Sequence, residues 1–360
     1  MIRFENDYLE GCIPEILEKL VNTNYEQIPG YRLDDYCETA SRKIKDRCNA
    51  NYLDVHYLVG GTQANMTVLD AILRPHQGVV STILGHINVH EVGAIEGRGH
   101  KVLALYNTDY MDEDNIELAQ QFDEESKLSP QTLKNYLDDY FKKDDWHTVQ
   151  PGAVYISHPT ERGALYTKDE LIQLKTICDE YEMPLYLDGA RLAYALAAEE
   201  NDIELEDLAK YCDIFYIGGT KCGALFGEAV CFSNKKYNKD FRNITKHNGA
   251  IIAKGRLLGL QFDVLFTDNT YTDKCRDAYM FAMRIKRAFE NKNIDFIANS
   301  FTNQQFPILS KEQQSYIKSC GINFNYETKI DNDYDAVRFC TDWATKKENI
   351  EYLESVISKL

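Results

Sequence analysis

The chain has 360 residues, of which 44% are hydrophobic and 27% are charged, the usual balance of a globular protein. This length allows a large core and favours one big domain with a smaller one. The formal net charge of −17 argues against a surface that binds nucleic acid or an anionic membrane, because both partners are negatively charged.

The first residues, "MIRFENDYLEG", are charged and lack the apolar segment of a signal peptide, and no apolar run approaches the roughly 18 residues of a membrane span. The ten cysteines are scattered without a CxxC pair. Several lie in apolar runs, as buried thiols of a reducing compartment do. These are Cys178, Cys212, Cys231 and Cys340. We therefore expect a cytoplasmic protein that does not contact a membrane.

The first predicted strand is "VHYLV" at 55–59, and a helix follows it over 60–73. The helix is indicated by apolar residues at helical spacing, from Met66 to Leu73. The acidic segment 107–145 is helical in character, and we expect a peripheral helix over 130–141 within it.

A second strand, "AVYIS" at 153–157, precedes a helix over 167–182, where Thr167 and Glu170 have the spacing of a capping box. Further short apolar strands are predicted at 184–188, 214–218 and 229–233. Continuous apolar strands separated by amphipathic helices indicate an α/β fold with a mainly parallel sheet sandwiched by helices.

From Lys254 onwards the pattern changes to long helices, a strand "AVRFC" at 336–340 and a closing helix over 347–360. We interpret this part as a smaller C-terminal α/β domain. The predicted organisation is an N-terminal arm at 1–15, a large domain at 16–253 and a small domain at 254–360.

Three chemical features fall at the carboxyl ends of predicted strands, where open parallel sheets bind ligands. The turn "VGGTQAN" joins a strand to a helix whose first N–H groups form an anion site. Asp188 directly follows "PLYL", and Lys221 follows "IFYIGGT". We expect an anion cradle, a carboxylate and a lysine to meet at one edge of the sheet.

This combination suits pyridoxal phosphate. The helix start at 61–63 would hold the phosphate, Lys221 would form a Schiff base with the aldehyde, and Asp188 would pair with the pyridine nitrogen so that the ring accepts electrons. Arg191 would lie near the ring oxygen or the substrate carboxylate. Taken singly, each feature has a structural alternative: a tight glycine turn, a helix cap and a solvated lysine.

The segments "GGTQAN", "LDGARL" and "GGTKCG", in this order, resemble the threonine aldolase family, whose members are pyridoxal-phosphate enzymes. The family groups with the β-eliminating lyases in the aspartate-aminotransferase fold class, fold type I. "RFENDYLEG" at 3–11 and "VRFCTDWATKKENIEYL" at 337–353 match the opening and closing segments of the family. The resemblance covers nearly the whole chain.

The resemblance makes Lys221 the Schiff-base lysine and Asp188 the partner of the ring nitrogen. Together with the helix start, it gives the following cofactor-binding residues: Gly61, Thr62, Gln63, His86, Asp188, Arg191, Thr220 and Lys221. The candidates for substrate binding are Arg191, Arg338 and Asn6, which stands where the family usually has serine.

His86, in "LGHINVHEVGA", matches the family histidine that stacks on the pyridine ring, and His90 is the second choice. The spacing of four residues would also put both rings on one helix face as a metal pair. We expect no metal, because a third ligand is missing and "HINVHE" is not the HExxH order.

The loop "SHPTERG" at 157–163 departs from the family. Glu161 aligns with a histidine that contacts the hydroxyl side of the substrate, and His158 is out of register. Glu161 would act as a base or form an ion pair with Arg162. The base that takes the hydroxyl proton is therefore left open among Glu161, His86 and water.

The resemblance implies cleavage of L-threonine, L-allo-threonine or similar β-hydroxy-α-amino acids to glycine and an aldehyde. The alternatives are β-elimination on another small amino acid and a non-catalytic protein of the same fold, against which the intact lysine and aspartate argue. The resemblance also implies a homodimer or homotetramer with the active site at the subunit interface.

Overall fold

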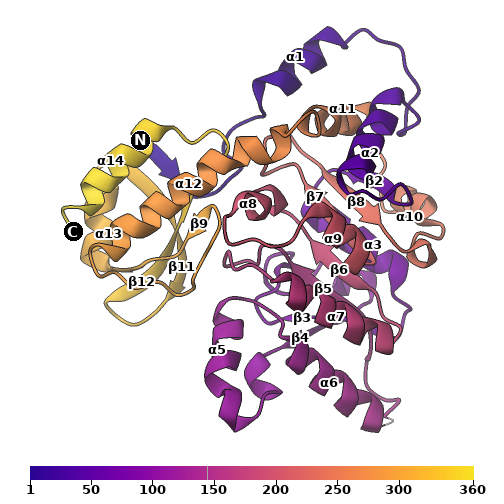
Figure 1. The fold of residues 1–360 in the computed structure, drawn as a ribbon, viewed down its shortest axis with the longest axis horizontal. Coiled ribbons are helices and arrows are strands. Elements are labelled where there is room, and N and C mark those ends of the chain that lie inside the picture. Colours follow the sequence, from indigo (N-terminus) through magenta and orange to yellow (C-terminus); the bar gives the residue numbers. More distant parts are fainter. Residues whose placement is uncertain (144) are drawn as a thin grey trace.

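The computed structural model describes residues 1–143 and 145–360 and contains a large sheet and a smaller one (Figure 1). The large sheet has seven strands in the order β2-β8-β7-β6-β5-β3-β4. Its strands are β2 (Asp54–Leu58), β3 (Gln77–Thr82), β4 (Val102–Leu105), β5 (Gln150–Ser157), β6 (Leu185–Asp188), β7 (Ile214–Gly218) and β8 (Glu228–Phe232).

The large sheet is mainly parallel, as predicted: β4, β3, β5, β6 and β7 run in the same direction, while β8 is antiparallel to both β7 and β2. The antiparallel direction of β8 follows from the short connection between the two strands. A parallel crossover needs roughly a dozen residues or more, and only the loop 219–227 joins β7 to β8. This loop carries Lys221, and the direct return places Glu228 opposite Gly218.

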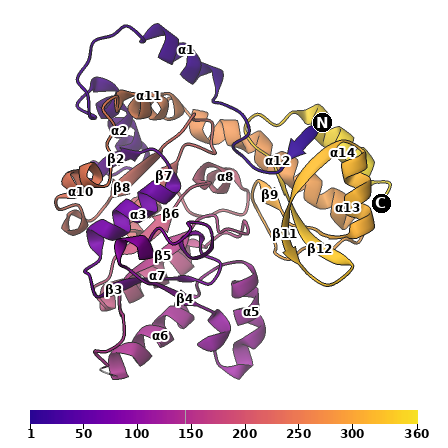
Figure 2. The ribbon, with the colours of Figure 1, turned by 180° about the vertical axis from the view of Figure 1, so that it is seen from behind.

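Helices cover both faces of the large sheet. One core contains apolar residues of α2 (Asp35–Arg47), α6 (Pro130–Lys143), α7 (Lys168–Glu180), α8 (Leu192–Ala197), α9 (Leu205–Tyr211) and α11 (Arg256–Leu265). The opposite core contains residues of α3 (Gly61–Ile72), α4 (His86–Val89) and α10 (Phe241–His247). Figure 1 shows α7 in front of the sheet, and α3 is in front in the reverse view of Figure 2. Along β5, Val154 and Ile156 enter the first core and Ala153 and Tyr155 the second, so both faces are buried.

The smaller sheet has the order β1-β11-β12-β10, with β9 also paired to β12. Its strands are β1 (Ile2–Phe4), β9 (Gln304–Gln305), β10 (Ile308–Ser310), β11 (Ile322–Lys329) and β12 (Tyr334–Cys340). A third core lies between these strands and the helices α12 (Thr270–Glu290), α13 (Lys311–Ser319) and α14 (Lys347–Ile357). The first strand of the chain therefore pairs in a sheet built from the last sixty residues, and the division at 15 and 253 stays a prediction.

The remaining helical segments are α1 (Pro14–Asn22), α5 (Ile116–Glu124) and four short 3₁₀ helices, Glu96–Arg98, Asn107–Asp109, Glu113–Asn115 and Lys235–Tyr237. In residues 1–143 and 145–360, no helix is both long enough and apolar enough to cross a membrane. All ten cysteines are free, and all except the half-buried Cys320 are buried.

The predicted strands and helices are present with ends shifted by a few residues, while the strands β1, β3, β4, β9, β10 and β11 were not predicted. The four residues of β4 form an apolar run too short to distinguish from a loop by its pattern. The predicted capping box of α7 is confirmed: the Glu170 amide donates to the Thr167 hydroxyl at 3.2 Å, and the Thr167 amide donates to the Glu170 carboxylate at 2.8 Å.

We predict that Thr167→Ala lowers the free energy of unfolding by about 1 kcal/mol, because the amide of Glu170 loses its acceptor at the start of α7. Thr167→Ser keeps the hydroxyl and is expected to match the wild type more closely. Urea unfolding followed by circular dichroism measures the difference. Equal midpoints for Thr167→Ala and the wild type would contradict the prediction.

Candidate active site

A cavity of about 570 Å³ opens at the carboxyl ends of β2, β6 and β7, and β11 and β12 of the smaller sheet complete its wall. Most of the predicted site residues line this cavity. They are Gly61, Thr62, His86, Glu161, Asp188, Arg191, Thr220, Lys221 and Arg338, joined by the second-choice His90. Gln63 turns its side chain back to accept the Val59 amide at 3.2 Å.

The predicted anion cradle lies at the N-terminus of α3. Its N-cap residue is Gly60, which supplies no capping side chain. Within the described residues, the amides of Gly61, Thr62 and Gln63 find no hydrogen-bond acceptor. A side chain at Gly60 would meet no atom within 4 Å, so there is room beside these amides. Free amides at a helix start form a site for a phosphate group.

Asp188 ends β6 beneath the cavity and is held by three side-chain donors. The hydroxyl of Tyr155 donates to Oδ2 at 2.7 Å, the hydroxyl of Tyr216 donates to Oδ1, and Asn65 Nδ2 donates to Oδ2 at 3.0 Å. Burial by itself raises the pKa of Asp188, but the nearby His86 and these hydrogen bonds outweigh it and lower the pKa below its usual value. Asp188 is therefore an ionised carboxylate at neutral pH.

The surroundings of Asp188 include one tyrosine on each of three neighbouring strands, a pattern that was not among the predicted site features. Tyr155, Tyr186 and Tyr216 lie on the adjacent strands β5, β6 and β7, and all three enter the same core. The hydroxyl of Tyr186 donates to Asn65 Oδ1 at 2.8 Å, which turns the amide group of Asn65 toward Asp188. The signal in the sequence is one tyrosine in each of "AVYIS", "PLYLD" and "IFYIG".

His86, the first residue of α4, forms a pair with the buried Glu91. Its Nδ1 lies 2.8 Å from Glu91 Oε1, which also accepts from Asn65 Nδ2 at 2.7 Å. Because a carboxylate accepts, Nδ1 carries the proton and Nε2 of a neutral ring keeps its lone pair. His90 is exposed, and its ring centre lies 5.5 Å from that of His86.

Glu161 is held by three donors: the His86 amide and the Ser157 hydroxyl at Oε1, and the Ser126 hydroxyl at Oε2, each at 2.7 Å. The alternative that Glu161 pairs with Arg162 is wrong, because Arg162 instead donates to the carbonyl of Glu124 at 3.3 Å.

His158 is buried outside the lining of the cavity. Its Nε2 lies 3.2 Å from Asn201 Oδ1, and its Nδ1 accepts the Tyr166 amide at 3.3 Å. Burial lowers the pKa of His158 to about 4, so the ring is neutral, and its two hydrogen bonds give it a structural role.

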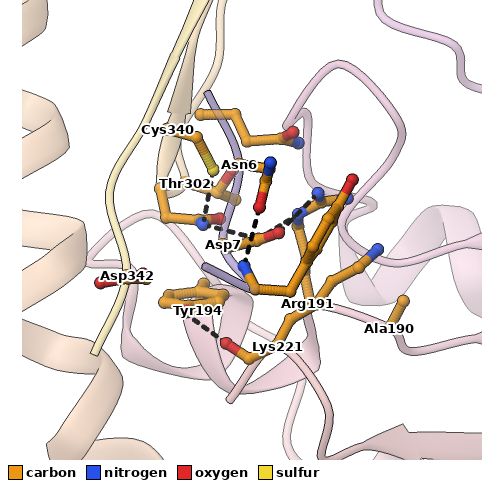
Figure 3. A network of polar contacts seen from close by, with 12 residues as sticks. Asn6, Asp7, Ala190, Arg191, Tyr194, Lys221, Thr302, Cys340 and Asp342 are labelled. Carbon is orange, nitrogen blue, oxygen red and sulfur yellow. Dashed lines mark hydrogen bonds and ion pairs between the residues drawn. The ribbon is translucent and has the colours of Figure 1, made fainter. Parts of the chain in front are cut away.

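Lys221 lies in the loop between β7 and β8, and its carbonyl accepts from the hydroxyl of Tyr194 at 2.7 Å (Figure 3). Within the part of the chain that the structure describes, the ammonium group has no carboxylate at ion-pair distance. Burial and the charge of Arg191 lower the pKa of Lys221, although Asp7 and Asp188 oppose the shift. A lowered pKa gives more of the free amine, the nucleophilic form.

Asp7 is a buried partner of Arg191 that the list of predicted site residues did not include (Figure 3). Arg191 Nε donates to Oδ2 at 2.6 Å and Nη2 donates to Oδ1 at 3.0 Å, while Asn303 Nδ2 donates to Oδ2 at 3.0 Å. Burial opposes ionisation, but Arg191 and Lys221 lower the pKa of Asp7 to about 2. Two nitrogens of the Arg191 guanidinium are thus bonded to Asp7, and Arg191 also lines the cavity.

Arg338 reaches the cavity from β12 of the smaller sheet, and its Nη2 donates to the carbonyl of Glu5 at 3.3 Å. Asn6 Oδ1 accepts the amide of Tyr8 at 3.1 Å, and Tyr8 lines the cavity. The two predicted arginines therefore line the same cavity from different elements, Arg191 from the start of α8 and Arg338 from β12.

A mainly parallel sheet with a lysine loop, a buried aspartate and an anion cradle at one edge is the arrangement of fold type I enzymes. Comparison with solved structures supports the same fold. The histidinol-phosphate aminotransferase of Clostridium acetobutylicum shares the fold, with a TM-score of 0.69, 12% identity, and full coverage of both chains. The sequence profile of the beta-eliminating lyase family matches residues 30–311, and the chain belongs to this family.

Two relatives are more similar in sequence. The structure of the threonine aldolase of Leishmania major has a TM-score of 0.91 and 35% identity, covering 100% of this chain and 99% of that one. A low specificity L-threonine aldolase of Pseudomonas sp. (strain NCIMB 10558) is 27% identical over 272 residues, which are 75% of this chain and 72% of that protein.

We predict that Asp7→Asn lowers the free energy of unfolding by about 3–5 kcal/mol at neutral pH, because it leaves the buried guanidinium of Arg191 without a countercharge. The pKa of Asp7 is about 2 in the folded protein against 3.8 ordinarily. Its contribution is therefore fully present above pH 3.8 and is lost as the pH falls through about 2.

Denaturant unfolding of the wild type and Asp7→Asn at a series of pH values measures this effect, and the difference should narrow only in that acidic window. The control Glu15→Gln removes an exposed carboxylate paired with Lys274 and should cost at most about 1 kcal/mol. A small or pH-independent difference for Asp7→Asn would contradict the prediction.

Proposed function

We propose that the protein is a pyridoxal-phosphate-dependent aldolase that cleaves L-threonine, L-allo-threonine and similar β-hydroxy-α-amino acids to glycine and an aldehyde. The observation that carries the proposal is one cavity that holds a lysine with a lowered pKa, an ionised aspartate and an uncapped helix start. The similarity to the threonine aldolases of Leishmania major and Pseudomonas sp. supports the substrate class.

The donor set fits pyridoxal phosphate. The free amides of Gly61, Thr62 and Gln63 suit the phosphate, and the carboxylate of Asp188 suits a protonated pyridine nitrogen. Lys221 provides the amine that bonds to the cofactor. When bound, the cofactor supplies an aldehyde for this amine and a ring that accepts the electron pair of the broken Cα–Cβ bond. The hydroxyl of Thr220 already donates to Glu228 at 2.8 Å, so its role toward the phosphate is an additional proposal.

Arg191 and Arg338 are proposed to bind the substrate carboxylate. Planar guanidinium groups bind carboxylates through paired hydrogen bonds, and both arginines line the cavity. Asp7 fixes the plane of Arg191, so that group is oriented before substrate arrives. Asn6 lies next to Asp7 in the same segment and is proposed as a further polar contact of the substrate.

Among the three candidates for the base, we propose His86. Glu91 holds Nδ1 at 2.8 Å, which leaves Nε2 able to accept the proton of the substrate hydroxyl. Glu161 is already bonded to three donors and fixes the amide of His86, so it positions the histidine. The ring of His86 also suits stacking on the cofactor.

We also propose a cytoplasmic homodimer or homotetramer with the cavity near a subunit interface. The free thiols fit a reducing compartment. Apolar side chains on and near α1 are exposed, including Leu17, Val21 and Tyr25 at 49%, 74% and 94%. Figure 1 shows α1 at the outer edge of the molecule, where a second subunit would cover these residues.

We predict that purified protein incubated with L-threonine releases glycine and acetaldehyde, and that borohydride reduction fixes the cofactor to the peptide containing Lys221. Lys221→Ala should lose both the covalent attachment and the activity, because no amine remains in the loop. Chromatography and peptide mass spectrometry provide the measurements. Release of a 2-oxo acid and ammonia instead would favour β-elimination, and a label on another lysine would refute the assignment.

We predict that His86→Phe lowers the rate of threonine cleavage by roughly 10²–10⁴-fold, because it keeps a flat ring for stacking and removes the basic Nε2. Cofactor content, measured by absorbance, should be close to that of the wild type. The comparison variant Glu161→Gln keeps an acceptor for the amide of His86 and should lose much less. The reverse order of the two losses would make Glu161 the base.

A further inference from the structure

Glu228 is a buried acid in the active-site cavity to which the proposed reaction assigns no role. It begins β8 and lies in register with Gly218 at the end of β7 and with Leu58 at the end of β2. These two strand ends lead into the loop of Lys221 and the turn that starts α3. Glu228 is 3% exposed and lines the cavity with Lys221.

The carboxyl group of Glu228 contacts the lysine loop through neutral donors. The hydroxyl of Thr220 donates to Oε1 at 2.8 Å, and the amide of Gly219 donates to Oε2 at 3.3 Å. The Thr220 hydroxyl in turn accepts the amide of Gly227 at 3.0 Å, which joins the two ends of the loop. Among the described residues, Glu228 has no cation at ion-pair distance.

Glu228 and Asp188 line the same cavity, but their pKa values are shifted in opposite directions. Burial raises the pKa of Glu228 to about 8, and the hydrogen bond from Thr220 and the charge of Lys221 offset this only in part. Asp188 has more donors and stays ionised. The titratable groups that interact with Glu228 are Lys221, Asp188, Tyr186, Tyr216 and Tyr271. Two carboxyl groups whose pKa values are shifted apart mark separate acid–base roles.

We propose that Glu228 is a positioning residue that controls the charge of the Lys221 amine: an ionised Glu228 favours the ammonium form of Lys221, and a protonated Glu228 does not. The physical cause is the attraction between a carboxylate and an ammonium group that line the same cavity, where the burial of Glu228 reduces screening by water. The inference rests on the proposed function only in that Lys221 is the residue that bonds to the cofactor.

The test measures how fast Lys221 reacts with acetic anhydride from pH 6 to pH 10 in the cofactor-free, full-length protein. Peptide mass spectrometry compares its acetylation with that of exposed lysines in the same sample. In Glu228→Gln the apparent pKa of Lys221 should be lower, so its amine should react about three- to tenfold faster than in the wild type at pH 8 to 9. Superimposable pH profiles would overturn the proposal.

Glu161→Gln is the matched control, because it removes a carboxylate from the same cavity that bonds to α4 and not to the lysine loop. Its Lys221 profile should match the wild type. An equal shift in both variants would assign the effect to the total charge of the cavity and overturn a specific role for Glu228.

If Glu228→Gln does not fold, Thr220→Val and Thr220→Ser provide the test. Valine removes the donor that lowers the pKa of Glu228, so the influence of Glu228 on Lys221 should begin at a higher pH, whereas serine keeps it. Identical profiles for valine and serine would overturn the proposal. Because acetylation needs no cofactor, its outcome is separate from the borohydride test of the proposed function.

Discussion

The candidate active site is built around one negative charge, that of Asp188, at the buried end of a central strand. Burial of a carboxylate costs several kcal/mol unless hydrogen bonds replace water. The replacement here comes from the phenol groups of Tyr155 and Tyr216 on the two strands next to β6, and from Asn65 on α3. Asp188 can therefore stay ionised only while α3 packs against the sheet and brings Asn65 to it.

Asp188 is also linked to other side chains of the cavity by a chain of hydrogen bonds. Asn65 links Asp188 to Glu91, which holds the ring of His86. From the amide of His86 the chain continues to Glu161 and Ser157, whose hydroxyl oxygen lies 3.3 Å from the hydroxyl oxygen of Tyr155. A substitution at one member is thus expected to affect the others, and the contributions of these residues should not add independently.

A second buried charge fixes the other side of the cavity. Asp7 follows β1 of the smaller sheet, Arg191 precedes α8 of the large unit, and Asn303 precedes β9. Three segments far apart in sequence thus meet at one carboxylate, as Figure 3 shows for Asp7 and Arg191. The position of the Arg191 guanidinium is therefore set by the placement of the N-terminal segment and not by α8 alone.

The sequence by itself determined the alternation of strands and helices and the three chemical landmarks at strand ends, because periodicity, glycine turns and the order of residues are local properties. It did not determine that β8 runs antiparallel, that Asp7 is the partner of Arg191, or that Glu161 bonds to His86 and not to Arg162. Nor did it separate the pKa values of Asp188 and Glu228. These depend on burial and on partners distant in sequence, and only the packing of the tertiary structure brings such groups together and removes water from them.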